Sequence, residues 1–253
     1  MKYSWKSKYT LISCVLFIIL WEISAVLINN DIYIPKIECI LWEVVNLVRD
    51  KHFYIYASSS FLRTVISYSA ALILSIILGI LSLVYPFFRY LINPINLFIK
   101  TIPTLVLVVL ALVWFDKDKA PFIVGFAIIF PILYEGIQNS LYKVDEKILE
   151  MCNIYEVSMY DKIRKIYIPT IKFYIINIFV STISLTFKVV IAGEVHGQPR
   201  YGIGSQIQLE KVNFNTTGIF AWILIIIFIS LIFELINIKL NKVTYRWLNE
   251  DKH

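Results

Sequence analysis

The chain has 253 residues, of which 58% are hydrophobic and only 17% are charged. A soluble domain of this length carries more charge on its surface, so the composition excludes an ordinary soluble protein and predicts a membrane protein. The net charge of +6 does not indicate nucleic-acid binding, because the basic residues lie between apolar blocks and form no separate basic face.

Six apolar blocks, each near the roughly 20 residues that a helix needs to cross a bilayer, predict an all-α, polytopic membrane protein. The first block is no cleaved signal peptide, because it is too long, contains Trp21-Glu22 and is followed by no small-residue cleavage site. We expect the last five helices to form a compact five-helix core, with the first helix added at its edge. In chain order the predicted spans are 10–29, 61–85, 97–115, 121–141, 170–191 and 218–240.

The segment 31–60 is too polar to cross the bilayer. Apolar residues recur at helical spacing within 37–48, which predicts an amphipathic helix lying at the outer surface. We therefore divide the chain into three parts. They are 1–60 (cytoplasmic N-terminus, first span and amphipathic segment), 61–240 (core, with a cytoplasmic loop at 142–169) and 241–253 (cytoplasmic tail).

The distribution of Lys and Arg predicts that both termini are cytoplasmic, because cytoplasmic loops carry the excess of these residues. With that orientation, thirteen lie inside: Lys2, Lys6, Lys8, Arg89, Lys143, Lys147, Lys162, Arg164, Lys165, Lys239, Lys242, Arg246 and Lys252. Seven lie outside: Lys36, Arg49, Lys51, Lys117, Lys119, Arg200 and Lys211.

The loop between the fourth and fifth predicted spans contains two predicted short helices. The first covers 146–155 with Asp145 as its N-cap, and the second begins after Ser158, which has capping-box spacing to Asp161. Pro169 is expected to start the fifth span. A short helix held out of the membrane in this way can dock in a groove of a soluble partner; an ordinary charged connecting loop is the alternative.

This loop resembles the conserved cytoplasmic loop of binding-protein-dependent ABC importer permeases, which reads Glu-Ala-Ala, then Gly three to four residues later, then Leu-Pro or Ile-Pro. Glu150-Met151-Cys152 matches its start, Val157-Ser158 its middle and Ile168-Pro169 its end. Two residues depart from the pattern. Cys152 replaces a small Ala, and Tyr155 stands where the family often has Gly, so we expect a turn strained by about 1 kcal/mol there.

The resemblance extends over about 11–240 and is to permeases of the nitrate, sulfonate and taurine type and their thiamine-precursor relatives. Asp116 departs from it, standing where the family commonly has Gly. The matching motifs are Phe61-Leu62-Arg63, Gly79, Asn93-Pro94, Ile102-Pro103, Trp114-Phe115, Phe130-Pro131, Lys188 to Glu194, and Gly197-Gln198-Pro199-Arg200-Tyr201-Gly202-Ile203-Gly204.

The resemblance implies a permease subunit that forms the path for a small polar or anionic organic solute. It implies as partners an ABC ATPase subunit, an extracytoplasmic substrate-binding protein and a second copy of the chain. The residues expected to couple to the ATPase are Glu150, Met151, Cys152, Ile154, Tyr155, Ser158 and Pro169.

Polar, proline and glycine residues in or near the spans are candidates for the translocation path. A lysine at membrane depth usually faces a cavity or a partner, so Lys188 either contacts the solute, pairs with Glu194 or extends to the outer headgroups. Pro103 and Pro131 should bend their helices. Gly202 and Gly204 are expected in a tight outer turn, which either partly closes the path or simply connects two spans.

The sequence contains no nucleotide-binding loop, no metal-ligand cluster and no nucleophile motif. Its three cysteines are far apart and predict neither a metal site nor a disulfide framework. We therefore expect a non-catalytic subunit without a cofactor of its own, with ATP bound by a partner. The alternative is a secondary transporter or channel driven by an ion gradient, which would need inverted repeats or paired intramembrane carboxylates, and neither is evident.

Overall fold

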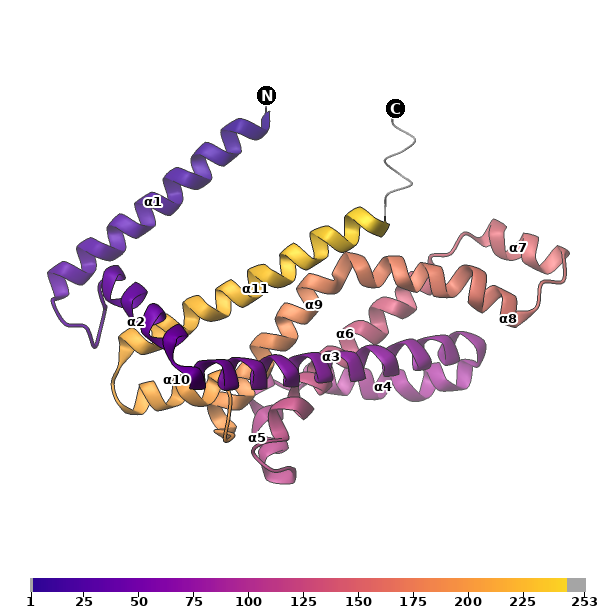
Figure 1. Cartoon of the computed structure of the whole chain (residues 1–253). Coiled ribbons are helices and arrows are strands. Elements are labelled where there is room, and N and C mark those ends of the chain that lie inside the picture. The colour runs from indigo at the N-terminus through magenta and orange to yellow at the C-terminus, as the bar shows by residue number, and fades with distance from the viewer. Residues whose placement is uncertain (1, 245–253) are drawn as a thin grey trace.

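The computed structural model describes residues 2–244, except the side chains at 2–8, 10, 11, 237 and 240–244. Every regular element in that part of the chain is helical, which confirms the all-α prediction. Figure 1 shows a long bundle with α7 and α8 at one end and α2 and α10 at the other. We call these the α7 end and the α10 end. The predicted tail lies, from residue 245 onward, outside the described residues.

The centre of the bundle consists of α3 (Lys51–Val84), α6 (Ala120–Tyr142) and α9 (Ile168–Gly197). Small residues let these helices approach closely, as is usual between membrane helices. A Cβ atom at Gly79 of α3 would lie 2.8 Å from the Ile137 side chain of α6, and one at Gly125 of α6 would lie 2.8 Å from Val190 of α9. The face of α3 that packs against its neighbours is a stripe of Ser60, Thr64, Ser67, Ala71, Ser75, Gly79 and Ser82.

Hydrogen bonds between helices join the same stripe to α6. The Ser67 hydroxyl donates to the Phe122 carbonyl at 3.0 Å, and the Ser75 hydroxyl donates to the Phe130 carbonyl at 3.3 Å. Such bonds satisfy polar groups that lipid cannot, and they fix the register of α3 on α6.

The third predicted span is not one continuous helix. It is a pair, α4 (Pro86–Thr101) and α5 (Thr104–Trp114), bent by 105° between them. The break falls at Ile102-Pro103, where Pro103 is the N-cap of α5 and disfavours helical backbone at Ile102. The expected bend at Pro103 is therefore confirmed and is larger than a kink. α6 continues as one helix through Pro131.

At the N-terminal side, α1 (Lys2–Ile28) stands apart from the bundle in Figure 1, which agrees with a helix added at the edge. It is tied to α2 (Ile37–Arg49), the predicted amphipathic helix. The Trp21 indole donates to the Pro35 carbonyl at 3.0 Å, and Glu22 accepts from the Ile37 backbone N–H at 3.3 Å. Glu22 thus satisfies a free N–H at the start of α2.

At the α10 end, α10 (Ile203–Val212) packs on α9 and leads into α11 (Thr216–Thr244), which returns along the bundle. α3 begins ten residues before the predicted span. Its 34 residues are more than the roughly 20 that a helix needs to cross a bilayer, so 51–60 extends beyond the predicted span.

At the α7 end, α7 (Glu146–Ile154) and α8 (Met159–Lys162) form the two predicted short helices. Pro169 lies in the first turn of α9, as expected, but no break precedes it. The helical backbone is continuous from Met159 to Gly197, through a π-helical turn, η1 (Ile163–Tyr167), just before the proline. In that turn the Ile168 N–H bonds to the Ile163 carbonyl, and the wider turn accommodates the missing N–H and the ring of Pro169.

Among the residues that the structure describes, four helices are long and apolar enough to cross a membrane, and the α4–α5 pair makes a fifth span if it is counted as one. The apolar stretch of α1, Ile12–Ile28, is shorter. The chain is therefore a polytopic, all-α membrane protein, and the count of six spans stays a prediction.

Candidate functional site

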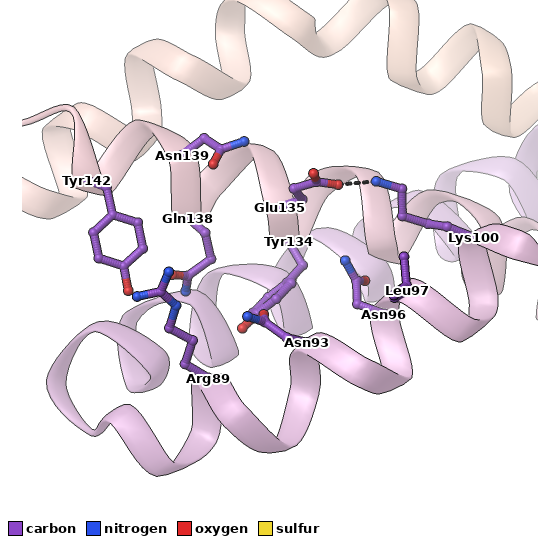
Figure 2. A pocket seen from close by; sticks show the side chains of 10 residues that line it. All are labelled: Arg89, Asn93, Asn96, Leu97, Lys100, Tyr134, Glu135, Gln138, Asn139 and Tyr142. Carbon is purple, nitrogen blue, oxygen red and sulfur yellow. Dashed lines mark hydrogen bonds and ion pairs between the residues drawn. The ribbon is translucent and has the colours of Figure 1, made fainter.

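A polar pocket of about 260 Å³ lies between α4 and α6, in the half of the bundle toward the α7 end. On α4 the polar residues recur every three or four positions, so they form one stripe, and a second stripe on α6 faces it (Figure 2). The residues that line the pocket are Arg89, Asn93, Asn96, Leu97, Lys100, Tyr134, Glu135, Gln138, Asn139 and Tyr142.

The charged groups of the pocket lie at its rim. Lys100 and Glu135 form an ion pair across the two helices, with their side chains 40% and 49% exposed. The Arg89 guanidinium lies 4.7 Å from the centre of the Tyr142 ring, a cation–π contact that leaves its N–H donors available. Because charged side chains are costly in contact with lipid tails, this face is unsuited to lipid.

Two buried amides at the pocket have their orientation fixed. The Asn96 amide donates to the Pro131 carbonyl at 3.4 Å, and the Gln138 amide donates to the Gly79 carbonyl at 2.7 Å. A flipped amide would set oxygen against oxygen, so the NH₂ groups are assigned by these bonds. The oxygens, Asn96 Oδ1 and Gln138 Oε1, are buried and find no partner among the described residues. An unpaired buried acceptor costs about 1–3 kcal/mol.

A second polar cluster lies at the α10 end, around Glu194 of α9. Its carboxylate is completely buried and accepts from the Ser60 hydroxyl at 2.6 Å, the Arg63 guanidinium at 2.7 Å and the Gly204 N–H at 3.0 Å. We call Ser60, Arg63, Glu194 and Gly204 the α10-end cluster.

Arg63 extends this cluster to two loops. It donates to the Tyr201 carbonyl at 2.6 Å and lies 3.7 Å from the Asp118 carboxylate, which also accepts from the Arg200 backbone N–H at 3.0 Å. One guanidinium thus joins α3, α9, the loop before α6 and the loop before α10. A buried carboxylate that accepts hydrogen bonds from three residues holds these segments together and is not free to bind a ligand.

The cluster corrects two expectations. Glu194 does not pair with Lys188, because Arg63 holds it, and its enclosed carboxylate is not a wall of an open path. Gly202 and Gly204 do not form the expected tight turn, because Gly202 is extended and Gly204 lies in the first turn of α10. Gly202 has extended backbone, and a Cβ atom there would lie 2.7 Å from the Glu194 carboxyl carbon, so both glycines serve to cover that carboxylate closely.

Lys188 lies exposed on α9, and no ion pair joins it to another described residue. It is outside the α4–α6 pocket, as is Pro103, whereas the carbonyl of Pro131 accepts the Asn96 amide at the pocket. Pro131 is thus hydrogen-bonded to a residue of the pocket, and the other sequence-predicted path residues are not among the residues that line it.

The predicted coupling segment is a capped helix with an exposed apolar surface. Asp145 accepts from the Lys147 N–H at 2.9 Å, as an N-cap does. Ser158 caps α8 by accepting from the Asp161 N–H at 3.1 Å, which confirms it as the N-cap. The Asp161 carboxylate accepts from the Ser158 hydroxyl at 2.8 Å, and not from the Ser158 backbone N–H as in the usual capping box. The exposed apolar side chains are Ile148, Met151, Ile154, Tyr155, Met159 and Tyr160.

Cys152 differs from the other residues of this segment because its side chain is buried beneath α7, near Tyr167. The expectation that it contacts a partner is wrong. A side chain larger than Cys would push α7 away from the bundle, which explains why this position takes a small residue. Leu149 also packs inward, against the cluster of Ile137, Leu141, Tyr167 and Ile171.

The strained turn after α7 lies one residue later than expected. Tyr155 has ordinary backbone, with φ −87°, whereas Glu156 has φ 50° and the Val157 N–H bonds to the Cys152 carbonyl at 2.8 Å. This is the helix end at which Gly is favoured, four residues after Cys152.

The pocket residues were missed in the sequence because they were judged one at a time. In the sequence, Asn93 stands out only as part of the Asn93-Pro94 motif. The signal was present as polar residues at 89, 93, 96 and 100, one face of a helix otherwise rich in apolar residues.

Together, broken and continuous membrane helices around a polar pocket define a membrane transport protein. Residues 67–242 match the family described as binding-protein-dependent transport system inner membrane component. The chain belongs to this family, and is thus a permease subunit of an ABC importer. A search of the curated proteins finds no match.

Proposed function

We propose that the chain forms the translocation path of an ABC importer for a small polar organic solute and couples that path to a separate ATPase through α7. The observation that carries the coupling proposal is the apolar outer surface of α7. Ile154 and Tyr155 are 78% and 76% exposed, on a helix that projects from the end of the bundle (Figure 1). A protein partner is the natural cover for such a surface outside the membrane.

In this proposal the α7 end and both termini face the cytoplasm, in the cell membrane, and an extracytoplasmic binding protein delivers the solute at the α10 end. Family membership supports the ATPase and the extracytoplasmic binding protein as partners, and the Lys and Arg distribution supports the orientation. ATP binding would close the ATPases, move α7, and shift the path between outward-open and inward-open states. The chain itself supplies no catalytic group.

The path is proposed to run between two copies of the chain, since one five-helix core is small for a path. The polar face of α4 and α6 is its best-supported wall, with Pro131 behind it and the α4–α5 break at Pro103 beside it. Lys188 stays a candidate on α9, and Lys188→Met should reduce uptake while the protein still inserts in the membrane. Unchanged uptake would remove Lys188 from the path.

The coupling proposal is tested by replacing Met151 and Ile154 with Asp together. We expect the double variant to lose the co-purifying ATPase and ATP-driven uptake, because two charges would stand at the centre of the docked surface. Far-UV circular dichroism should show unchanged helix content, since both side chains are already exposed.

A matched control is Leu209→Asp with Val212→Asp on α10, two apolar residues that are 50% and 64% exposed at the opposite end. This variant should retain the ATPase. If the α7 variant also retains the ATPase and transports, α7 is only a connector.

A further inference from the structure

An apolar groove of about 300 Å³ lies between α3 and α9, in the half of the bundle toward the α7 end. Ile76 of α3 forms one wall, and the buried side chain of Ile171 on α9 forms the floor. Ile168 lies at the rim and is 48% exposed. Since α3 and α9 are both long and apolar enough to cross a membrane, the groove opens to lipid. Lys172 is the charged residue among those that line the groove, and the other lining residues are Ile175 and Ile176.

The position of Lys172 along α9 places it near the lipid headgroups at the α7 end. Toward the α10 end, the chain has no further charged residue until Lys188, which is 16 positions or about 24 Å away along the helix. An uncharged stretch of this length approaches the hydrocarbon thickness of about 30 Å. Because side chains on a helix tilt toward its N-terminus, Lys172 extends toward the α7 end and therefore toward the headgroups.

Lys172 has no counter-ion in the part of the chain that the structure describes. It is exposed, and none of the ion pairs includes it. Lys165, by contrast, is paired with Asp161 at 2.9 Å. A lysine at headgroup level attracts anionic lipid, and its long apolar stem lies along the same hydrocarbon surface as the acyl chains. The groove thus combines an apolar channel with an unpaired cation at its headgroup end.

We propose that this groove is a binding site for an anionic phospholipid of the leaflet at the α7 end, with an acyl chain along the isoleucines and the headgroup phosphate on Lys172. Among the described residues that line the groove there is no carboxylate to bind the amine of a zwitterionic headgroup, so the groove favours a headgroup with net negative charge. Arg164 stands four positions before Ile168 on about the same face, and it extends the positive surface beyond Lys172. The site goes beyond the permease function and does not depend on the solute.

The test is native mass spectrometry of the full chain, purified in a mild detergent and titrated with phosphatidylglycerol or with phosphatidylcholine. The two lipids carry identical acyl chains, so they differ in headgroup alone. We expect phosphatidylglycerol to bind about fivefold more tightly, because a single lysine near an anionic headgroup contributes about that factor. Equal binding of the two lipids to the unaltered chain would overturn the proposal.

Charge variants locate the headgroup. Lys172→Gln should remove the preference for phosphatidylglycerol, a loss of about fivefold. The matched control is Lys143→Gln, because Lys143 is an exposed lysine at the same end of the bundle but outside the groove. Both variants remove one positive charge, and only the first should change the preference.

A second pair of variants locates the acyl chain. Ile168→Trp should weaken the binding of both lipids, because the indole ring would occupy the groove at its rim. Ile77→Trp on α3 is the control, since Ile77 is 49% exposed, as Ile168 is 48% exposed, and does not line the groove. Both side chains are exposed, so neither replacement requires the bundle to repack.

Three other results would contradict the site. A preference that survives Lys172→Gln, or that Lys143→Gln lowers equally, would show a general attraction between a basic protein and anionic lipid. Displacement of phosphatidylglycerol by glycerol 3-phosphate would show an anion site that does not use the groove. Self-association that Ile168→Trp abolishes while lipid binding persists would assign the groove to a second copy of the chain.

Discussion

The two polar regions of this membrane protein use similar residues for opposite purposes. In the α10-end cluster, Glu194 is fully buried and receives donors from three residues, and Arg63 joins four segments. In the α4–α6 pocket, the ion pair is half exposed and two buried acceptors are unpaired. A buried polar group whose hydrogen bonds are all made fixes the structure around it, whereas a half-exposed ion pair holds its two helices together only weakly.

The difference in hydrogen bonding between the α10-end cluster and the α4–α6 pocket also indicates which helices of the bundle are held rigidly and which can move. The α10-end cluster ties α3, α9 and two loops at one point, so we expect these elements to move as one body. α4 is attached to α6 by weaker contacts and ends at a 105° break, so it is the element best able to move separately.

The largest expected effect on stability comes from breaking the Arg63–Glu194 ion pair, and the Lys100–Glu135 ion pair serves as the comparison. Arg63→Met should lower the free energy of unfolding by about 3–5 kcal/mol, because it leaves the buried Glu194 carboxylate without its cation. Lys100→Met should cost only about 0–1 kcal/mol, because that pair is half exposed. Denaturation of the detergent-purified chain measures both.

Adding Glu194→Gln to Arg63→Met should recover more than half of the loss, because the unpaired charge is then gone. Equal losses for the two single variants would show that the two ion pairs do not differ as described.

A smaller effect is expected from adding one methyl group at each end. Gly204→Ala should cost about 1–3 kcal/mol, because its Cβ would lie 2.4 Å from the Ile191 backbone carbonyl and 2.5 Å from Glu194 Cβ. At Gly136 the obstacle is the Tyr174 side chain, both its hydroxyl and the ring carbons next to it.

Gly136→Ala should therefore cost less in a Tyr174→Ala background than in the unaltered chain, whereas no single side-chain change should relieve Gly204→Ala, because its obstacle is backbone. Thermal unfolding of the single and double variants checks this. A cost of Gly136→Ala that is the same in both backgrounds would contradict the explanation.

The smallest effect on stability is expected from placing glycine at the two residues with left-handed backbone that follow α7 and α10. Glu156→Gly after α7 and Phe214→Gly after α10 should each stabilise the chain by about 1 kcal/mol, because both residues have positive φ, 50° and 56°. Only Glu156→Gly is expected to alter ATPase capture, since it adjoins the docking surface. A change in capture by Phe214→Gly would show that capture follows general stability instead.

Local sequence signals predicted the short elements well. The N-cap Asp145, the Ser158–Asp161 cap and the amphipathic helix over 37–48 depend on neighbours within one or two turns, and all three are present. The continuity of α8 with α9 was not predicted, because the π-helical turn that joins them before Pro169 gives no pattern that single-residue preferences report.

The sequence by itself determined that this is an all-α membrane protein, because hydrophobic block length follows directly from bilayer thickness. It also predicted the capped helix at 146–154, the segment that we propose for coupling, because its caps and apolar residues are contiguous in the chain. Only the tertiary structure decided which charge pairs with which. Arg63 and Glu194 are 131 positions apart, and Lys100 and Glu135 are 35 apart, so their pairing depends on how α3, α4, α6 and α9 pack. The unpaired oxygens of Asn96 and Gln138 follow from the same packing, because each amide's NH₂ is committed to a backbone carbonyl on another helix.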